Sequence, residues 1–296
     1  MDLSHVDVQS ERPRHPIPVD WVSVSNLRIP FHKLEDDGVR LASAPVISAG
    51  IGLPKHQRGI HASRTYEAIT SVLSDLDLHG IRLGGDVVGE IARKMLSLHS
   101  YGSVSRVVVK AEAFYWDKTP VSNLSSLQSF HLIYRADGQR LGDSIHVKDF
   151  IGVKVAGMTA CPCAKEVIKK IYNIDDTPLP IGTHMQRSFA KVIVQNGYGI
   201  KLSDLLGLVR SCFSNRTVEY LKRIDEAKLV ADALERPRFV EDVARDIVHN
   251  IVTVYSHIPD DNKIFVWVKS LESIHEHNLE ARICISFGEA RRHIGF

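Results

Sequence analysis

Cysteine, excess charge and long apolar stretches are all scarce in this sequence. Four cysteines in 296 residues are too few for a disulfide framework, so we expect them to serve as thiols or thiolates. Acidic and basic residues nearly balance, and the net charge of +2 does not favour nucleic acid as the main partner. No apolar run approaches the ~20 residues that cross a bilayer, and residues 1–16 contain no hydrophobic signal core. We therefore expect a cytoplasmic globular protein with no nucleic-acid or membrane partner.

The chain divides into a polar arm and two similar runs of secondary structure. Residues 1–20 are polar and contain three prolines, which predicts an extended arm. In the first run, residues 21–140, β-branched and alternating segments predict strands at 21–31, 39–53, 105–116 and 129–136, with helices at 66–78 and about 88–98. In the second run, residues 141–296, the expected strands lie at 143–160, 186–195, 262–271 and 279–287, and the helices at 203–213 and 238–256.

Both runs have the order ββααββ, which predicts an α+β fold with antiparallel sheets and helices on one face. A polar turn at 35–38 separates the first two strands, and Ser203 is placed to cap its helix. The sequence of residues 89–100 resembles that of 241–252, which suggests an internal duplication, although a shared amphipathic pattern also accounts for much of this similarity.

Half of the cysteines occur in one short motif, Cys161-Pro162-Cys163, at the end of a predicted strand. Neighbouring positions of an extended segment point to opposite faces, so the two thiols cannot easily form a disulfide with each other. Proline fixes its own φ and ends the strand, which can direct one sulfur into a cleft. From the motif alone, buried packing and chemistry remain equally good interpretations.

Four other polar groups are candidates for chemistry, each with a structural alternative. His184 and Arg187 precede a predicted strand and can be ordinary surface residues. Glu226 lies in "LKRIDE", which also fits a solvated helix end with charge pairs. Glu241 begins an amphipathic helix, where a carboxylate stabilises the helix start. The dense group 272–278 lies between two strands, and we favour a site there because a simple hairpin turn would more typically use Asn-Gly or Asp-Gly.

A thiolate, an imidazole and a carboxylate together would give three protein ligands and leave one position of a divalent metal open. A soft sulfur ligand combined with His and Glu suits Zn or Fe(II), with Mn possible, and argues against Mg or Ca. The spacing alone does not show that these residues meet.

Several motifs in a fixed order resemble the type IB GTP cyclohydrolases, and the similarity to the archaeal branch of that family is greater. The motifs are "DVQSERPRHPIPVDWVSVSNLRIP", "LPKHQRGIHASR", "VAGMTACPCAKE", "GTHMQRS", "LKRIDE", "PRFVED" and "ESIHEHN". The insertion at 165–180 between the cysteine and histidine motifs departs from the bacterial pattern, in which the two lie closer together.

The resemblance implies a tunnelling fold (T-fold) with two ββααββ units per chain, assembled into a homo-oligomer, a dimer or tetramer, with active sites at subunit interfaces. It implies GTP as substrate, hydrolytic opening of the guanine imidazole ring and release of formate. For the archaeal branch it implies 7,8-dihydroneopterin 2′,3′-cyclic phosphate plus diphosphate, for methanopterin-type pterin biosynthesis, with Fe(II) as the ion and Mn or Zn as alternatives. Two other functions remain open: formation of 7,8-dihydroneopterin triphosphate, as in the bacterial branch, or non-catalytic purine or pterin binding. A structural zinc protein is a third alternative.

The resemblance also implies a role for individual residues. Cys161, His184 and Glu226 would hold the metal. Cys163 and His275 would line the same pocket, with His275 as a candidate proton shuttle because its unperturbed pKa lies near neutrality. Glu241 would accept N–H groups from the guanine edge, with Glu272 as a second candidate. Arg187 and Lys165 are the candidates for binding the triphosphate.

Overall fold

The computed structural model describes residues 6–29, 31, 33, 34, 36, 38–77, 82–174, 177, 179–196 and 198–295. The chain forms two compact units. Unit 1 comprises residues 1–35, 41–111 and 133–151, and unit 2 comprises 36–40, 112–132 and 152–296. The units are therefore interleaved along the sequence. The expected division into T-fold units at 21–140 and 141–296 stays a prediction.

Unit 1 combines antiparallel strands with two helices. Strand β1 (Val19–Arg28) pairs with β3 (Val46–Leu53), and β3 pairs with β4 (Val104–Lys118), both antiparallel. Helix α1 (Ala62–Asp77) packs on α2 (Gly85–Leu98), and α2 contacts β3. The predicted end of the first helix, at 78, lies outside the described residues, as do two of the four positions of the predicted turn at 35–38.

The polar arm is almost entirely exposed, but it is bound to the loop before α1. It contains the short 3-10 helix η1 (Val8–Ser10). The carbonyl of Gln9 accepts hydrogen bonds from the backbone of Arg58 and Gly59 and from the side-chain amide of Gln57. His61 Nε2 lies 2.9 Å from Asp7 Oδ1. The arm is thus fixed in place by hydrogen bonds rather than by apolar burial.

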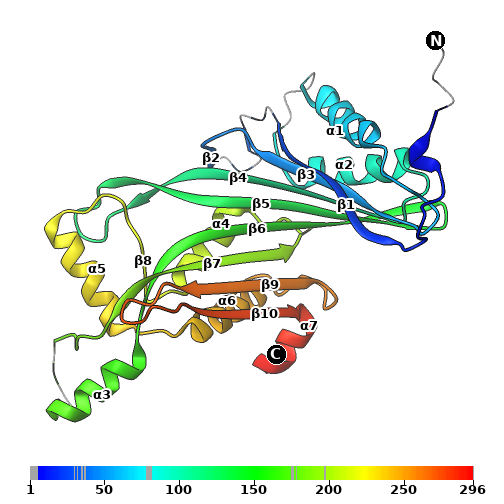
Figure 1. The fold of residues 1–296 in the computed structure, drawn as a ribbon. Coiled ribbons are helices and arrows are strands. Elements are labelled where there is room, and N and C mark those ends of the chain that lie inside the picture. Colours follow the sequence, from blue (N-terminus) through cyan, green and yellow to red (C-terminus); the bar gives the residue numbers. More distant parts are fainter. Residues whose placement is uncertain are drawn as a thin grey trace. The chain divides into compact units, whose positions relative to one another are not determined.

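In unit 2 the strand order is β6-β7-β9-β10, in which β7 (Met185–Gln195), β9 (Lys263–Ser270) and β10 (Leu279–Ser286) follow β6 (Ser144–Ala160). The long strand β5 (Ser125–Leu141) lies between β4 and β6, and the two-residue strands are β2 (Arg40–Leu41) and β8 (Asn215–Arg216). Helix α6 (Val240–Val254) packs on β9 and β10 and lies behind them in Figure 1, while α4 (Leu202–Ser211) and the C-terminal α7 (Phe287–Ile294) both pack on α6.

The core of unit 2 follows from the two periodicities of the sequence. Alternate residues of β9, among them Ile264 and Val268, are buried, as is typical of a strand with one face on the core. Helix α6 buries Val243, Ile247 and Ile251, which share one helix face, and it packs on β9 and β10. Strands β7 and β9 are joined by their own antiparallel ladder, which runs from the Ser188–Ser270 pair to the Val194–Ile264 pair. The prediction of an α+β fold with antiparallel strands and covering helices is therefore confirmed.

Three helices and one predicted cap differ from the sequence expectations. Helices α3 (Pro162–Tyr172), α5 (Arg223–Glu235) and α7 were not predicted. The prediction that Ser203 caps α4 is wrong, because the helix begins at Leu202 and the Ser203 amide instead donates to Asp36 Oδ2 at 2.7 Å. The cap comes from a residue distant in sequence, so no local pattern could show it. Among the described residues, no helix is long and apolar enough to cross a membrane.

Candidate active site

Cys161 and His184 are brought together where β6 ends and β7 begins. The backbone N–H of Cys161 donates to the carbonyl of His184 at 3.0 Å, and Thr183 Oγ1 donates to the carbonyl of Cys161 at 2.8 Å. These bonds continue the pairing of neighbouring strands past the end of the sheet. They connect residues that are 23 positions apart, across the insertion that contains α3.

The cysteine motif forms the start of α3 as well as the end of β6. Cys161 is the N-cap of α3, Pro162 occupies its first turn, and Cys161 Sγ accepts the Ala164 N–H at 3.4 Å. Proline is well suited to this position because its fixed φ is helical and it lacks an N–H that would have no partner there. The thiol of Cys161 is half-buried, whereas Cys163 is exposed in the first helical turn. The two thiols therefore have different surroundings, in agreement with separate roles.

Cys212 shows what a packing cysteine looks like in this chain. It is fully buried, and burial raises the pKa of its thiol to about 11. A thiol of that pKa stays neutral near pH 7 and does not bind a metal readily. Cys161 is the half-buried cysteine that lies beside a histidine, so it is the better ligand candidate.

A hydrogen bond at Nδ1 holds the imidazole of His184. His184 Nδ1 lies 3.0 Å from Gln186 Oε1, and Ser273 Oγ lies 3.4 Å from the same nitrogen. An amide oxygen at Nδ1 places the ring proton there, which leaves Nε2 with a lone pair. Metal-binding histidines commonly donate their second N–H to an oxygen in this way.

Polar side chains of β6, β7 and β9 form a hydrogen-bonded chain that starts at Gln186, the partner of this histidine. Gln186 Nε2 donates to Thr159 Oγ1 at 3.2 Å and lies 3.5 Å from Glu272 Oε1. Thr159 Oγ1 lies 2.7 Å from Ser188 Oγ and 3.4 Å from Ser270 Oγ. The hydroxyls are buried, so these contacts satisfy polar groups that would otherwise be costly to bury.

The group 272–278 forms the loop that joins β9 to β10, since Leu279 pairs with Ser270. The loop is thus a hairpin connection, but its first residues face the site: Glu272 contacts Gln186, and Ser273 contacts His184. His275 is exposed and stacks on His277 with ring centroids 4.7 Å apart. The position of His275 at the loop tip leaves its role as a proton shuttle a prediction.

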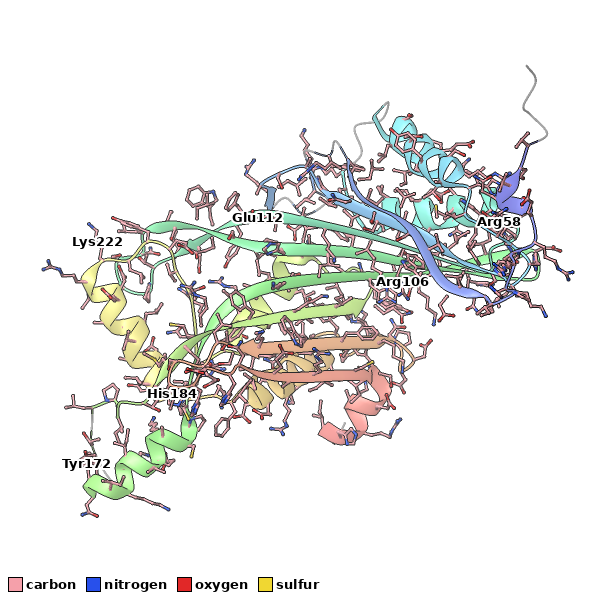
Figure 2. All side chains as sticks on the ribbon, in the orientation of Figure 1. Arg58, Arg106, Glu112, Tyr172, His184 and Lys222 are labelled. Atoms are coloured by element: carbon pink, nitrogen blue, oxygen red, sulfur yellow. The ribbon has the colours of Figure 1, made fainter. Side chains whose placement is uncertain are left out.

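Glu226 lies in the first turn of α5, at the opposite end of that helix from the Cys161–His184 pair. The end of α5 contacts the helix that follows Cys161, because Lys165 Nζ of α3 donates to the Leu234 carbonyl at 2.6 Å. Leu234 follows Glu226 by eight positions, which is about 12 Å along a helix at 1.5 Å per residue. Figure 2 accordingly shows Lys222, the residue before α5, far from His184.

Two other predicted substrate-binding residues, Glu241 and Arg187, lie on segments that are hydrogen-bonded to residues next to the site. Glu241 is exposed in the first turn of α6, and the segment before it is held to the end of β6 by the bond from Arg238 N to the Ala160 carbonyl, 3.0 Å. Arg187 is exposed at the start of β7, and its carbonyl accepts the Leu271 N–H at 3.0 Å.

Two of the three predicted metal ligands are thus neighbours, and the third is not beside them. Within the described parts of the chain, no three His, Cys, Asp or Glu side chains lie close enough together to hold a metal ion. The donor chemistry nevertheless fits a divalent transition metal, because the half-buried Cys161 is joined through its backbone to His184, whose Nδ1 is held by an amide oxygen. The pair would hold such an ion and needs at least one further ligand.

Sequence reasoning missed the residues that support the histidine. Gln186 and Thr159 were not among the candidates, although Gln186 is two positions from His184 and therefore lies on the same face of the chain. That spacing was a usable signal. The contribution of Thr159 depends on the pairing of β6 with its neighbours and had no local signal.

Comparison with known structures first defines the class of fold. A highly active mutant of Bacillus sp. TB-90 urate oxidase matches with a TM-score of 0.50 over 93% of this chain and 98% of that chain, at 6% identity. A structure titled as a highly active BTUO mutant matches with a TM-score of 0.51 over 91% and 98%. At such low identity the likeness concerns the fold alone.

The sequence then shows the family: the chain belongs to the type I GTP cyclohydrolase FolE2 family, whose model matches residues 6–281. It is 32% identical to the GTP cyclohydrolase MptA of Methanothermobacter thermautotrophicus over 97% of this chain and 95% of that protein. It is 31% identical to the MptA of Methanococcus maripaludis strain C6, over 92% of both chains.

Proposed function

We propose that this protein is a metal-dependent GTP cyclohydrolase with tandem T-fold units. It opens the imidazole ring of GTP, releases formate and forms 7,8-dihydroneopterin 2′,3′-cyclic phosphate and diphosphate, for methanopterin-type pterin biosynthesis. The observation that carries the proposal is the pairing of Cys161 with His184, whose Nδ1 is fixed by Gln186. Similarity to the MptA proteins over nearly the whole chain supports the cyclic product.

Each residue has one task in this proposal. Cys161, His184 and Glu226 hold the ion, which is Fe(II) in the proposal, with Mn or Zn as alternatives. When bound, the ion supplies Lewis acidity and makes a water molecule a stronger acid. Cys163 lines the pocket next to the substrate, and His275 moves a proton during ring opening.

The remaining residues bind the two ends of GTP. Glu241 accepts two N–H groups from the guanine edge, as a carboxylate can, and Glu272 assists from the loop after β9. Arg187 and Lys165 bind phosphate oxygens. The Lys165 ammonium already donates one hydrogen bond to Leu234, but it has three N–H donors, so two remain for phosphate.

A second copy of the chain completes the site in this proposal, within a dimer or tetramer. Glu226 is exposed, and apolar side chains beside it are exposed as well: Tyr220 by 49% and Ile224 by 58%. Helix α3, which follows Cys161, exposes 65% of Ile171 and 69% of Tyr172. Exposed apolar groups near polar functional residues are typical of subunit interfaces.

Subunit mixing tests the shared site. Cys161→Ala and Glu226→Gln are each expected to be inactive, and hybrid oligomers assembled from the two variants should regain part of the wild-type activity, because some interfaces then contain neither substitution. A mixture that stays as inactive as its components, although exchange is shown by mass, would contradict a site shared between subunits.

The reaction is tested by anaerobic turnover of GTP with Fe(II), Mn(II) and Zn(II) compared side by side. Formate, diphosphate and the mass of the pterin are measured. Cys161→Ala should abolish formate release, whereas Cys284→Ser, which changes an exposed thiol on β10, should leave it intact. Formate without diphosphate would identify the triphosphate product instead. GTP binding without formate in every metal would leave a non-catalytic binding protein.

A further inference from the structure

Asp225 is a fully buried carboxylate in the first turn of α5. Helix α5 is otherwise largely exposed, and its buried residues are Asp225, Leu229 and Ala233, spaced four apart on one face. An apolar residue would be expected at the first of these positions, as at the other two. A buried carboxylate is costly unless every oxygen is hydrogen-bonded, so its presence here calls for specific partners.

Three of its four donors come from the loop between β4 and β5, and the fourth is the backbone N–H of Lys222. Asp225 Oδ1 accepts the backbone N–H groups of Val121 at 2.9 Å and Ser122 at 2.8 Å. Asp225 Oδ2 accepts the Ser122 hydroxyl and, at 3.1 Å, the backbone N–H of Lys222. One side chain thus binds four donors and ties the start of α5 to a loop more than a hundred positions away in sequence.

The loop is itself held in one conformation. Thr119 Oγ1 lies 2.8 Å from Ser122 Oγ and accepts the Leu124 N–H at 2.9 Å. The Thr119 N–H donates to the Leu124 carbonyl at 3.0 Å, which closes the loop. Asp225 therefore binds to a fixed support.

The position of Asp225 matters because the next residue is Glu226. The Glu226 backbone N–H donates to the Lys222 carbonyl at 2.9 Å, so its place in the first turn depends on the same cap that Asp225 holds. We propose that Asp225 is a positioning residue, which fixes the first turn of α5 and thereby aims the Glu226 carboxylate at the metal. This inference rests on the role of Glu226 in the proposed function.

A helix end can be stabilised by a simpler arrangement than a buried carboxylate bound to a distant loop. A Ser, Thr, Asp or Asn at the N-cap would satisfy the free N–H groups locally, and a leucine at 225 would add apolar burial. The chain instead has Lys222 at the N-cap and uses a buried carboxylate to reach a distant loop. Such an arrangement limits how the helix start can move.

The experiment measures metal binding directly, with Co(II) as the probe, by competition with a chromophoric chelator and by the absorption that a cobalt–thiolate bond to Cys161 would give. The variants of the full-length protein are Asp225→Asn, Ser122→Ala and Glu226→Gln. Asp232→Asn is the matched control, because that carboxylate lies on the same helix but pairs at the surface with Lys228. Helix content and the thermal midpoint without metal are measured for every variant.

We expect Asp225→Asn to weaken Co(II) binding by roughly 10–100-fold, as removal of a residue that orients a metal ligand does. It should also lower kcat for GTP more than it raises KM. Ser122→Ala removes only the hydroxyl donor and should weaken binding less, without unfolding the chain. Asp232→Asn should bind Co(II) as the wild type does.

Three outcomes would decide against the inference. Wild-type Co(II) affinity in both Asp225→Asn and Ser122→Ala, with a lowered thermal midpoint alone, would make Asp225 a purely structural residue. If Asp225→Asn does not fold, wild-type affinity in Ser122→Ala decides in the same way. Unchanged affinity in Glu226→Gln would remove Glu226 from the ligand set, and with it this inference, while formate release from GTP would still support the proposed function.

Discussion

Asp149, in unit 1, is destabilised by burial when its carboxylate is charged. Its replacement by asparagine should stabilise the protein at pH 8. Its Oδ1 is buried and has no hydrogen-bond partner among the described residues. Burial, with a further contribution from Asp86, raises the pKa of Asp149 from 3.8 to about 6. Helix α2 comes so close that a Cβ built on Gly89 would lie 2.8 Å from Oδ1, so no donor side chain fits there.

The sign and size of the effect follow from this pKa. A carboxyl whose pKa is higher in the folded state favours folding only when protonated, so stability is lost as pH rises from about 4 through about 6. At about 1.4 kcal/mol per pKa unit, the full cost at pH 8 is about 3 kcal/mol. Solvent screens a partly exposed group, which reduces the figure to about 1–2 kcal/mol. Asp149→Asn should regain about that amount at pH 8 and nothing at pH 4.

Urea denaturation of wild type and Asp149→Asn at pH 4, 6 and 8 measures this difference. Asp137→Asn is the opposite control, because ion pairs with Arg106 and Arg135 outweigh its burial and hold the pKa of Asp137 below its usual value. That variant should lose stability at pH 8 and lose less in acid. Equal free energies of unfolding for wild type and Asp149→Asn at pH 8, or a difference that does not change with pH, would refute the reasoning.

Three further predictions concern packing, pH and metal binding. Gly157→Ala should destabilise by about 1–3 kcal/mol in thermal unfolding, because its Cβ would lie 2.3 Å from the Phe213 ring, whereas Gly207→Ala, with open space around it in α4, should stabilise by about 0.5–1 kcal/mol. Burial lowers the pKa of His99, so the neutral imidazole contributes fully to the free energy of unfolding above pH 6.5, and this contribution is lost as pH falls below that value. In urea denaturation, His99→Asn should make the free energy of unfolding depend less on pH in this range. Gln186→Leu should weaken Co(II) binding by roughly 10–100-fold with little change in helix content, and wild-type affinity would exclude its role in orienting the imidazole.

The regular elements could be predicted where one periodicity dominates a long segment. The alternation in β9 and the apolar face of α6 are of this kind. Helix α5 escaped prediction because most of its residues are exposed and one of its three buried positions is a carboxylate, so the sequence shows no apolar stripe. Helix α3 differs from α5, because its sequence does contain apolar residues at helical spacing, but these residues, among them Val167 and Ile171, are exposed.

The candidate site divides in the same way. Cys161 and His184 could be named from the sequence because their motifs resemble a known family, and the structure brings these two together. Their supports, Gln186 and Thr159, depend on which strands pair, and strand pairing is a long-range property. A single sequence shows residue types and their spacing, but not which side chains of neighbouring strands are in contact.

The two parts of the proposed metal site are held by different kinds of structure. Cys161 directly follows β6 and His184 directly precedes β7, and a backbone hydrogen bond joins the two residues, so the paired strands limit how far they can separate. Glu226 is at the exposed start of a helix, where fraying is usual, and the Asp225 contacts oppose it. If Glu226 binds a metal ion held by another subunit, the Glu226 carboxylate must keep its position while the subunits associate. Asp225, a buried carboxylate bound to four donors, fixes that position. This role explains why a carboxylate is buried here in spite of its desolvation cost.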